Sequence, residues 1–212
     1  MPSSRWPEAP RLRRRQWLAG AAGLTGLSGL TGLAGLGVPS PARAADDPAA
    51  ALLAAGGVVL ALRHARAPGT FDPPGFRLGD CSTQRNLDEA GRTQSRQLGA
   101  WFRARGLVPA RVRSSPWCRC VDTATLAFGP PETWAALGSP RGSTETTSAE
   151  HQRALRQALQ AARGQAGRFE VWVTHMFVLA DLVGGGVDSG EGLVLQADDA
   201  GRPQVLARLK PA

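Results

Sequence analysis

Two histidines of this chain directly follow runs of mostly apolar residues. Residues 58–62 lead into Arg63 and His64, and residues 169–174 lead into His175. Apolar runs of this length are typical of parallel strands that are buried on both faces. Ligands of open α/β sheets bind where such strands end. We therefore expect both imidazoles at one sheet edge, where a neutral imidazole can act as a nucleophile near pH 7.

Two arginines are expected at the same edge. Arg63 precedes the first of these histidines. Arg119 falls at the start of a helix expected from Val121 to about Phe128, which follows a short strand at residues 108–115. A helix start favours an anion, and a guanidinium beside it can clamp phosphate oxygens. Taken singly, each residue can also be explained as a surface arginine or a structural strand-end histidine. Two arginines and two histidines facing one concavity instead indicate a site for a dianionic phosphoryl group.

The elements around these residues predict a three-layer α/β/α domain with a mostly parallel central sheet and a C-terminal β-hairpin. Residues 65–82 are rich in proline and glycine, which predicts an irregular loop at the rim of the site. Asp88 is the expected N-cap of a helix that Gly106 ends. Further helices are expected at 46–56, 149–163 and 176–182, and strands at 57–63, 168–174, 191–196 and 203–210, with a short strand within 129–148.

The first 44 residues are expected to be an export signal outside this domain. Arg14 and Arg15 stand before Gln-Trp-Leu, a weakly hydrophobic run extends to about Val38, and residues 42–44 form a small-x-small cleavage site. The paired arginines resemble those of a twin-arginine signal, which implies a periplasmic or secreted domain without a stable membrane anchor. An uncleaved anchor and a wrongly assigned start are the alternatives. The remaining 45–212 form one domain.

Net charge argues against nucleic acid as a partner. The chain has 25 basic and 17 acidic residues, a formal net charge of +8, but residues 1–44 hold six of the arginines and only one acid. Residues 45–212 therefore keep 19 basic and 16 acidic residues, a net charge of +3. The sequence contains no basic stripe with interleaved aromatic residues. A small phosphorylated substrate is the expected partner.

Four motifs, in order along residues 57–210, resemble the histidine phosphatase superfamily, which has the phosphoglycerate-mutase-like fold. Residues 62–65 (Leu-Arg-His-Ala) resemble its Arg-His-Gly signature, and residues 86–94 resemble its Leu-Thr-x-x-Gly-x-x-Gln helix start. Residues 114–124 resemble its Ser-Ser-Pro-x-x-Arg-x-x-x-Thr-Ala segment, and residues 173–175 its second histidine. The short chain favours the small branch of mutases and compact phosphatases, because the acid-phosphatase branch has His-Asp at the second histidine and a large inserted domain.

The resemblance implies a mechanism. His64 would attack phosphorus to form a phosphohistidine, while Arg63, Arg119 and His175 would bind the phosphoryl oxygens. The arginines would supply the charge that a metal supplies elsewhere, so no metal or other cofactor is expected. The region 138–150 lacks an obvious match to the acid of the branch, and Glu145 is the expected proton donor, with Glu150 the other carboxylate there. Ala65 stands where the family has glycine.

Three cysteines would meet an oxidising compartment after export. Cys81 lies in the rim loop, while Cys118 and Cys120 flank Arg119. We expect Cys81 to pair with one of the other two, which would hold the rim against the helix carrying the arginine. A free buried thiol is the alternative.

An exported phosphatase acting on phosphate monoesters is thus the expected function. The alternative is a non-catalytic binder of phosphorylated ligands on the same fold, because Ala65 and the unmatched acid depart from the pattern. A mutase is a third hypothesis, but the export signal argues against it.

Overall fold

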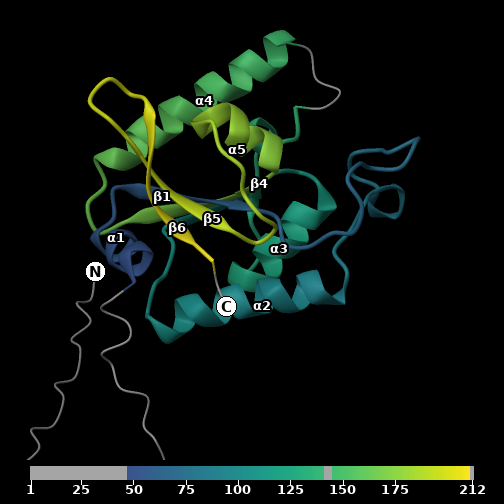
Figure 1. Cartoon of the computed structure of the whole chain (residues 1–212), viewed down its shortest axis with the longest axis horizontal. Coiled ribbons are helices and arrows are strands. Elements are labelled where there is room, and N and C mark those ends of the chain that lie inside the picture. The colour runs from purple at the N-terminus through teal and green to yellow at the C-terminus, as the bar shows by residue number, and fades with distance from the viewer. Residues whose placement is uncertain (1–46, 141–144, 211–212) are drawn as a thin grey trace, which may run out of the picture. The chain divides into compact units, whose positions relative to one another are not determined.

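A six-stranded sheet forms the centre of the part of the chain that the computed structural model describes, residues 47–140 and 145–210 (Figure 1). The strand order is β3-β2-β4-β1-β5-β6. Neighbouring strands from β3 to β1 are parallel, whereas β5 is antiparallel to both β1 and β6. The strands are β1 (Val58–Arg63), β2 (Arg111–Ser114), β3 (Glu132–Thr133), β4 (Phe169–Thr174), β5 (Gly192–Ala197) and β6 (Pro203–Leu209). The expected mostly parallel sheet with a C-terminal hairpin is confirmed.

Helices cover both faces of this sheet, as Figure 1 shows. Side chains of β1 alternate between the faces: Leu60 and Leu62 pack with α1, α2 and α3, whereas Val59 and Ala61 pack with α4 and α5. Both faces of the strand are therefore buried, which is why its sequence is apolar without alternation. The helices are α1 (Pro48–Ala55), α2 (Glu89–Ala104), α3 (Cys118–Phe128), α4 (Glu145–Arg163) and α5 (Met176–Val183). The expected three-layer α/β/α arrangement is confirmed.

Helix ends follow the capping residues that the sequence offers. The side chain of Asp88 accepts a hydrogen bond from the amide of Gly91 and caps α2, as expected. Glu89 lies in the first turn of α2, where the helix dipole favours an acid. Gly106, just after α2, has a φ of 65°, a value that glycine adopts at little cost.

Four boundaries differ from the expected ones. α3 begins at Cys118 rather than at Val121. β2 begins at Arg111 rather than at 108, because Pro109 has no amide hydrogen for the ladder. The apolar residues 134–137, expected within a short strand and loop, form a 3-10 turn (Ala135–Leu137) that buries Leu137 against α4 and β4. α4 begins at Glu145 instead of 149. The serine and threonine residues of its first turn have low helix propensity, so the sequence predicted a loop there and a later helix start.

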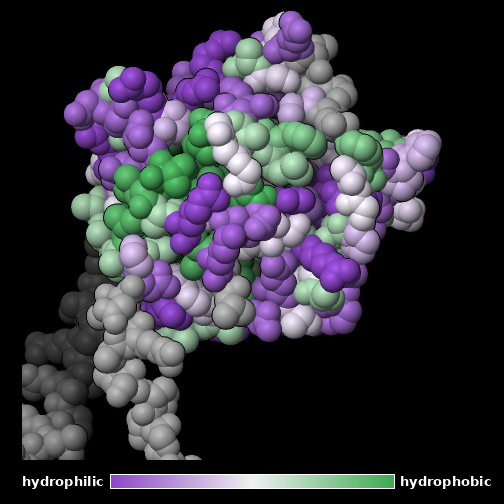
Figure 2. Space-filling view, in the orientation of Figure 1, coloured by the Kyte–Doolittle hydropathy of each residue, from purple (hydrophilic) through white to green (hydrophobic). Residues whose placement is uncertain are grey.

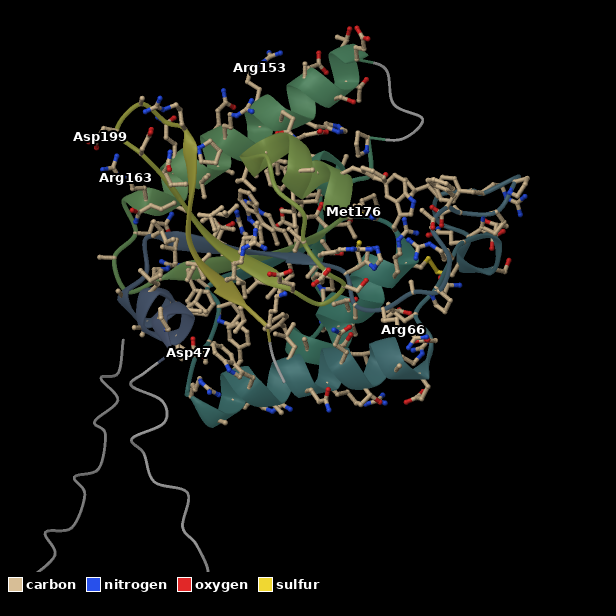
Figure 3. The ribbon with its side chains drawn as sticks, in the orientation of Figure 1. Asp47, Arg66, Arg153, Arg163, Met176 and Asp199 are labelled. Carbon is tan, nitrogen blue, oxygen red and sulfur yellow. A yellow bond between two sulfur atoms is a disulfide. The ribbon has the colours of Figure 1, made fainter. Side chains whose placement is uncertain are left out.

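The edge strand β6 carries exposed apolar side chains. Val205 and Leu206 are 40% and 42% exposed. Figure 2 shows a hydrophobic area on the side of the molecule where the β5–β6 hairpin lies, with hydrophilic residues next to it. Arg163 at the end of α4 pairs with Asp199 in the turn of this hairpin, at 2.6 Å (Figure 3).

No helix in the described ranges is both long and apolar enough to cross a membrane. The expected export signal, residues 1–44, lies outside those ranges.

Candidate active site

Three adjacent parallel strands deliver the site residues to one edge of the sheet. His64 directly follows β1, and its amide donates to the carbonyl of Thr174 at 2.9 Å, which extends the β1–β4 pairing. His175 directly follows β4 and is the N-cap of α5. Arg119 is the second residue of α3, which starts four residues after β2 ends. The structure therefore brings these residues together as the sequence predicts.

The hydrogen bond of His64 fixes which ring nitrogen carries the proton. Nδ1 lies 2.8 Å from the carbonyl oxygen of Ala65, an acceptor only, so Nδ1 is protonated and Nε2 has a free lone pair. The ring is 2% exposed. Burial, together with the nearby charges of Arg119, Arg85 and Arg63, lowers the pKa of His64 to about 3, although the hydrogen bond to Ala65 opposes this change. His64 is thus a neutral imidazole whose free Nε2 lone pair is directed away from its own backbone.

Arg119 contacts both imidazoles with one guanidinium. Its Nε donates to Nε2 of His64 at 3.2 Å, and its Nη2 lies 3.4 Å from Nδ1 of His175. The two imidazole rings are 5.5 Å apart between centroids. Arg119 is 4% exposed and pairs through Nη1 with Asp72 at 2.8 Å. A planar charged fork is thus held between the two histidines, which suits the oxygens of a phosphoryl group.

Ser115 orients His175. Its hydroxyl oxygen lies 2.8 Å from Nε2 of His175, while Nδ1 faces Arg119, which can only donate. Nδ1 of His175 is therefore the acceptor and Nε2 carries the proton. Burial and the charge of Arg119 lower the pKa of His175 well below its usual value, so this imidazole is also neutral.

A cavity of about 650 Å³ opens over these groups. Arg63, His64, Arg119 and His175 all line it. Arg63 donates through Nη1 to the carbonyl of Val187 at 2.8 Å, which holds its side chain beside the cavity.

Two further charged residues, Arg85 and Asp72, line the same cavity, and the sequence did not single them out. Both come from the rim loop between β1 and α2. Burial and the like charge of Arg119 lower the pKa of Arg85. The proline- and glycine-rich composition marks the loop as a rim, but it does not indicate which of its charged residues turn inward.

Asp72 connects the rim loop to the arginine clamp. One carboxylate oxygen accepts from Arg119 and from the amide of Arg85 at 3.0 Å, and the other accepts from the indole of Trp117 at 3.3 Å. Burial raises the pKa of Asp72, but the hydrogen bonds from the Arg85 amide, Arg119 and Trp117 outweigh burial and lower the pKa below its usual value. Asp72 is therefore a carboxylate anion that positions Arg119.

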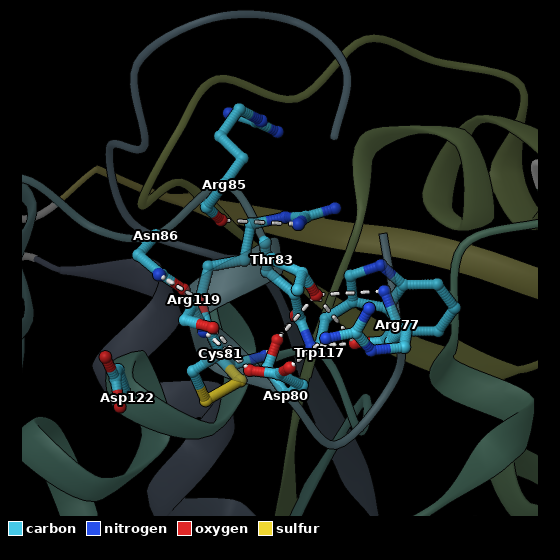
Figure 4. The surroundings of a disulfide bond; sticks show 12 residues. Arg77, Asp80, Cys81, Thr83, Arg85, Asn86, Trp117, Arg119 and Asp122 are labelled. Atoms are coloured by element: carbon cyan, nitrogen blue, oxygen red, sulfur yellow. Dashed lines mark hydrogen bonds and ion pairs between the residues drawn. A yellow bond between two sulfur atoms is a disulfide. The ribbon is translucent and has the colours of Figure 1, made fainter. Parts of the chain in front are cut away.

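A disulfide joins the rim loop to the start of α3. Cys81 bonds to Cys118, the residue before Arg119 (Figure 4). The amide of Cys118 also donates to the side chain of Gln84 at 3.0 Å, a second link between the same segments. Of the two expected pairings, the structure has the one to Cys118. Cys120 is a free, buried thiol whose pKa burial raises to about 12.

Glu145 is not among the residues that line the cavity. It is the first residue of α4 and is exposed. Its role as proton donor stays a prediction. No group of three or more histidine, cysteine, aspartate or glutamate residues within the described ranges is arranged to hold a metal ion.

Solved structures resemble this fold, although no family model and no curated protein matches the sequence. One is the open reading frame Rv3214 from Mycobacterium tuberculosis, with 17% identity, a TM-score of 0.51, and coverage of 70% of this chain and 94% of that one. A second is a phosphoserine phosphatase mutant from Entamoeba histolytica in complex with phosphoserine, with 10% identity, a TM-score of 0.50, and coverage of 71% and 95%. This chain has the fold of the histidine phosphatase superfamily.

A third similar structure is the protein histidine phosphatase SixA complexed with tungstate, with 21% identity, a TM-score of 0.48, and coverage of 73% of this chain and 97% of that one. At these identities the likeness concerns the fold. The fold expected from the four motifs is confirmed by the likeness to the Mycobacterium tuberculosis structure described above.

Proposed function

We propose that this chain is a phosphatase that hydrolyses phosphate monoesters through a phosphohistidine on His64. One observation carries the proposal: the bond from Nδ1 to the carbonyl of Ala65 leaves the lone pair of Nε2 facing Arg119 in the cavity. A neutral, buried nucleophile thus lies beside a permanent positive charge. Arg63 and Arg85 line the same cavity and can neutralise a dianionic phosphoryl group.

Each site residue has a role in this reaction. Nε2 of His64 attacks phosphorus in line, and the leaving oxygen departs on the opposite side. Arg63, Arg119 and His175 bind the three equatorial oxygens, whose charge they stabilise in the transition state. To bind a phosphoryl oxygen, His175 has to donate a hydrogen bond to it. In its present tautomer it can do so only after Nδ1 gains a proton or the contact with Ser115 changes. Arg119 donates without such a change. Glu145 remains the sequence-based proposal for the proton donor. It does not line the cavity, and a donor is needed only for a leaving group that cannot depart as an anion.

The test is turnover of p-nitrophenyl phosphate by the full chain, together with trapping of an acid-labile phosphoenzyme. His64→Ala is expected to abolish both signals. His151→Ala is the matched control, since His151 lies on α4 and does not line the site cavity. Turnover that persists in His64→Ala would contradict the proposed nucleophile.

A non-catalytic binder of phosphorylated ligands is the second candidate. Ala65 replaces the glycine of the family motif, and it is almost fully buried beside the nucleophile. Binding of inorganic phosphate without turnover of any ester would favour this candidate over the phosphatase.

We also propose that the domain is exported and works in the periplasm or outside the cell. The paired Arg14 and Arg15 support export, and the disulfide between Cys81 and Cys118 supports an oxidising compartment. Replacing both arginines by lysine should retain the protein in the cytoplasm, which cell fractionation followed by immunoblotting would show. Equal recovery of both forms outside the cytoplasm would contradict twin-arginine export.

A further inference from the structure

A row of aromatic rings leads from the rim of the cavity to the nucleophile. The rings of Phe76 and Trp117 are stacked, with centroids 5.5 Å apart and planes 12° from parallel. The edge of Trp117 meets His175 at 5.2 Å, and His175 meets His64 at 5.5 Å. A continuous row of ring contacts therefore leads from the phosphoryl site to the rim.

A second apolar wall borders the cavity at the start of α5. Met176 and Phe177 line the cavity there, and Phe71 lines it from the rim loop. Met176 is 38% exposed and Phe71 56% exposed. Figure 3 shows Met176 at the end of α5 that is directed toward the rim loop. Large apolar side chains exposed around a charged cavity are typical of a ligand-binding surface.

The carboxylate of the cavity is unsuited to protonating a leaving group. Among the described residues, Asp72 is the one carboxylate that lines the cavity. It accepts hydrogen bonds from Arg119, the amide of Arg85 and Trp117, all of which stabilise its anionic form. An alkoxide is a poor leaving group without an acid, whereas a phenolate can depart unprotonated. General acid catalysis typically contributes a factor of about 10² to 10⁴, which this cavity would forgo for alkyl esters.

We propose that the preferred substrates are aryl phosphomonoesters, whose aromatic leaving group lies between the Phe76–Trp117 pair and Met176. The proposal rests on the phosphatase activity proposed above and narrows it to one substrate class. A flat ring can stack on this half-buried aromatic pair, and its apolar area is removed from water there.

The reaction has two half-reactions, and the first needs no acid from the protein. The bond from Nε2 of His64 to phosphorus forms as the bond from phosphorus to the aryl oxygen breaks. The electron pair of the broken bond stays on oxygen as a phenolate, which takes a proton from water after it leaves. In the second half, a water oxygen bonds to phosphorus, the electron pair of the P–N bond returns to Nε2, and the proton of that water passes to solvent.

Three esters distinguish the effect of the leaving group's acidity from the effect of its aromatic area. Phenyl and 2-naphthyl phosphate have leaving groups of similar acidity but different aromatic area, whereas 2-phenylethyl phosphate keeps the ring and has an alkoxide leaving group. We expect 2-naphthyl phosphate to exceed phenyl phosphate about tenfold in kcat/KM, the effect of about 1.4 kcal/mol of extra burial. We expect 2-phenylethyl phosphate to inhibit competitively and to turn over at least about 100-fold more slowly than phenyl phosphate.

Variants of the two walls test where the ring lies. Phe76→Ala and Met176→Ala should each reduce the preference for 2-naphthyl over phenyl phosphate. Leu78→Ala is the matched control, since Leu78 is an apolar residue of the same rim loop, 52% exposed, that does not line the cavity. Phe76→Ala removes the ring that stacks on Trp117. If that variant fails to fold, Met176→Ala alone tests the position of the ring.

Two results would overturn the assignment: a kcat for 2-phenylethyl phosphate within about tenfold of that for phenyl phosphate, or a naphthyl preference unchanged in both wall variants. Failure of the proposed phosphatase activity itself would give a different result. In that case neither these esters nor p-nitrophenyl phosphate would be hydrolysed at all.

Discussion

Arg119 donates a hydrogen bond from Nε to Nε2 of His64 at 3.2 Å, so a permanent positive charge faces the nitrogen proposed as the nucleophile. This contact has two consequences. The charge helps to keep His64 unprotonated, and a phosphoryl group bound at Nε2 lies within reach of the same guanidinium. In the proposed reaction, one side chain therefore both helps to keep the nucleophile unprotonated and binds the anion. Its position depends on Asp72, the disulfide and the start of α3.

Acid should destabilise the folded protein through its buried histidines. Burial lowers the pKa of His64 from 6.5 to about 3, so between these pH values the unfolded chain binds a proton that the folded chain does not. The free energy of unfolding should then fall as pH drops below about 6.5, by up to about 1.4 kcal/mol per pH unit for His64, and His175 should add to this loss. Urea denaturation at pH 7, 6 and 5 measures the slope. His64→Gln should flatten it, and an unchanged slope in that variant would contradict the assignment.

Arg85 should contribute to substrate binding. It lines the same cavity as Arg119 and Arg63, where burial and the like charges of those residues lower its pKa, so it adds charge for a phosphoryl dianion. A charge-assisted hydrogen bond contributes about 1.5–3 kcal/mol, so Arg85→Ala should lower kcat/KM for p-nitrophenyl phosphate roughly 10- to 100-fold. Arg77→Ala is the control, since Arg77 is exposed in the same loop and pairs with Asp80 (Figure 4). Equal effects of the two variants would exclude a specific role for Arg85.

The sequence predicted the parts of the site that regular elements position. His64 and His175 follow strands whose apolar pattern is strong, and Arg119 lies in a helix start, so their convergence follows from the topology of a parallel sheet. Asp72 and Arg85 were missed because an irregular loop carries them. Their positions depend on contacts between distant residues, such as those of Asp72 with Arg119 and Trp117, and no local periodicity encodes such contacts.

The disulfide should contribute much of the stability of the rim. Cys81 and Cys118 are 37 residues apart, and the chain-entropy model gives about 4 kcal/mol for closing a loop of that size. Cys81→Ser/Cys118→Ser should lower the free energy of unfolding by about this amount. It should also make unfolding insensitive to reductant, which destabilises the wild type. Cys120→Ser is the control because this thiol is unpaired, and wild-type stability that is unaffected by reductant would contradict the prediction.

Asp72 should act by positioning Arg119 and not as a proton donor. Asp72→Asn removes the charge that pairs with Nη1 of Arg119 at 2.8 Å, so the clamp should lose its fixed orientation and kcat should fall. Because positioning affects every substrate alike, the loss should be the same for p-nitrophenyl phosphate, which has a good leaving group, and for phenyl phosphate, which has a poorer one. A proton donor would instead matter more as the leaving group becomes more basic. A loss that grows from the first ester to the second would identify Asp72 as the acid, and Glu145→Gln measured on the same pair would show whether the sequence-based candidate contributes.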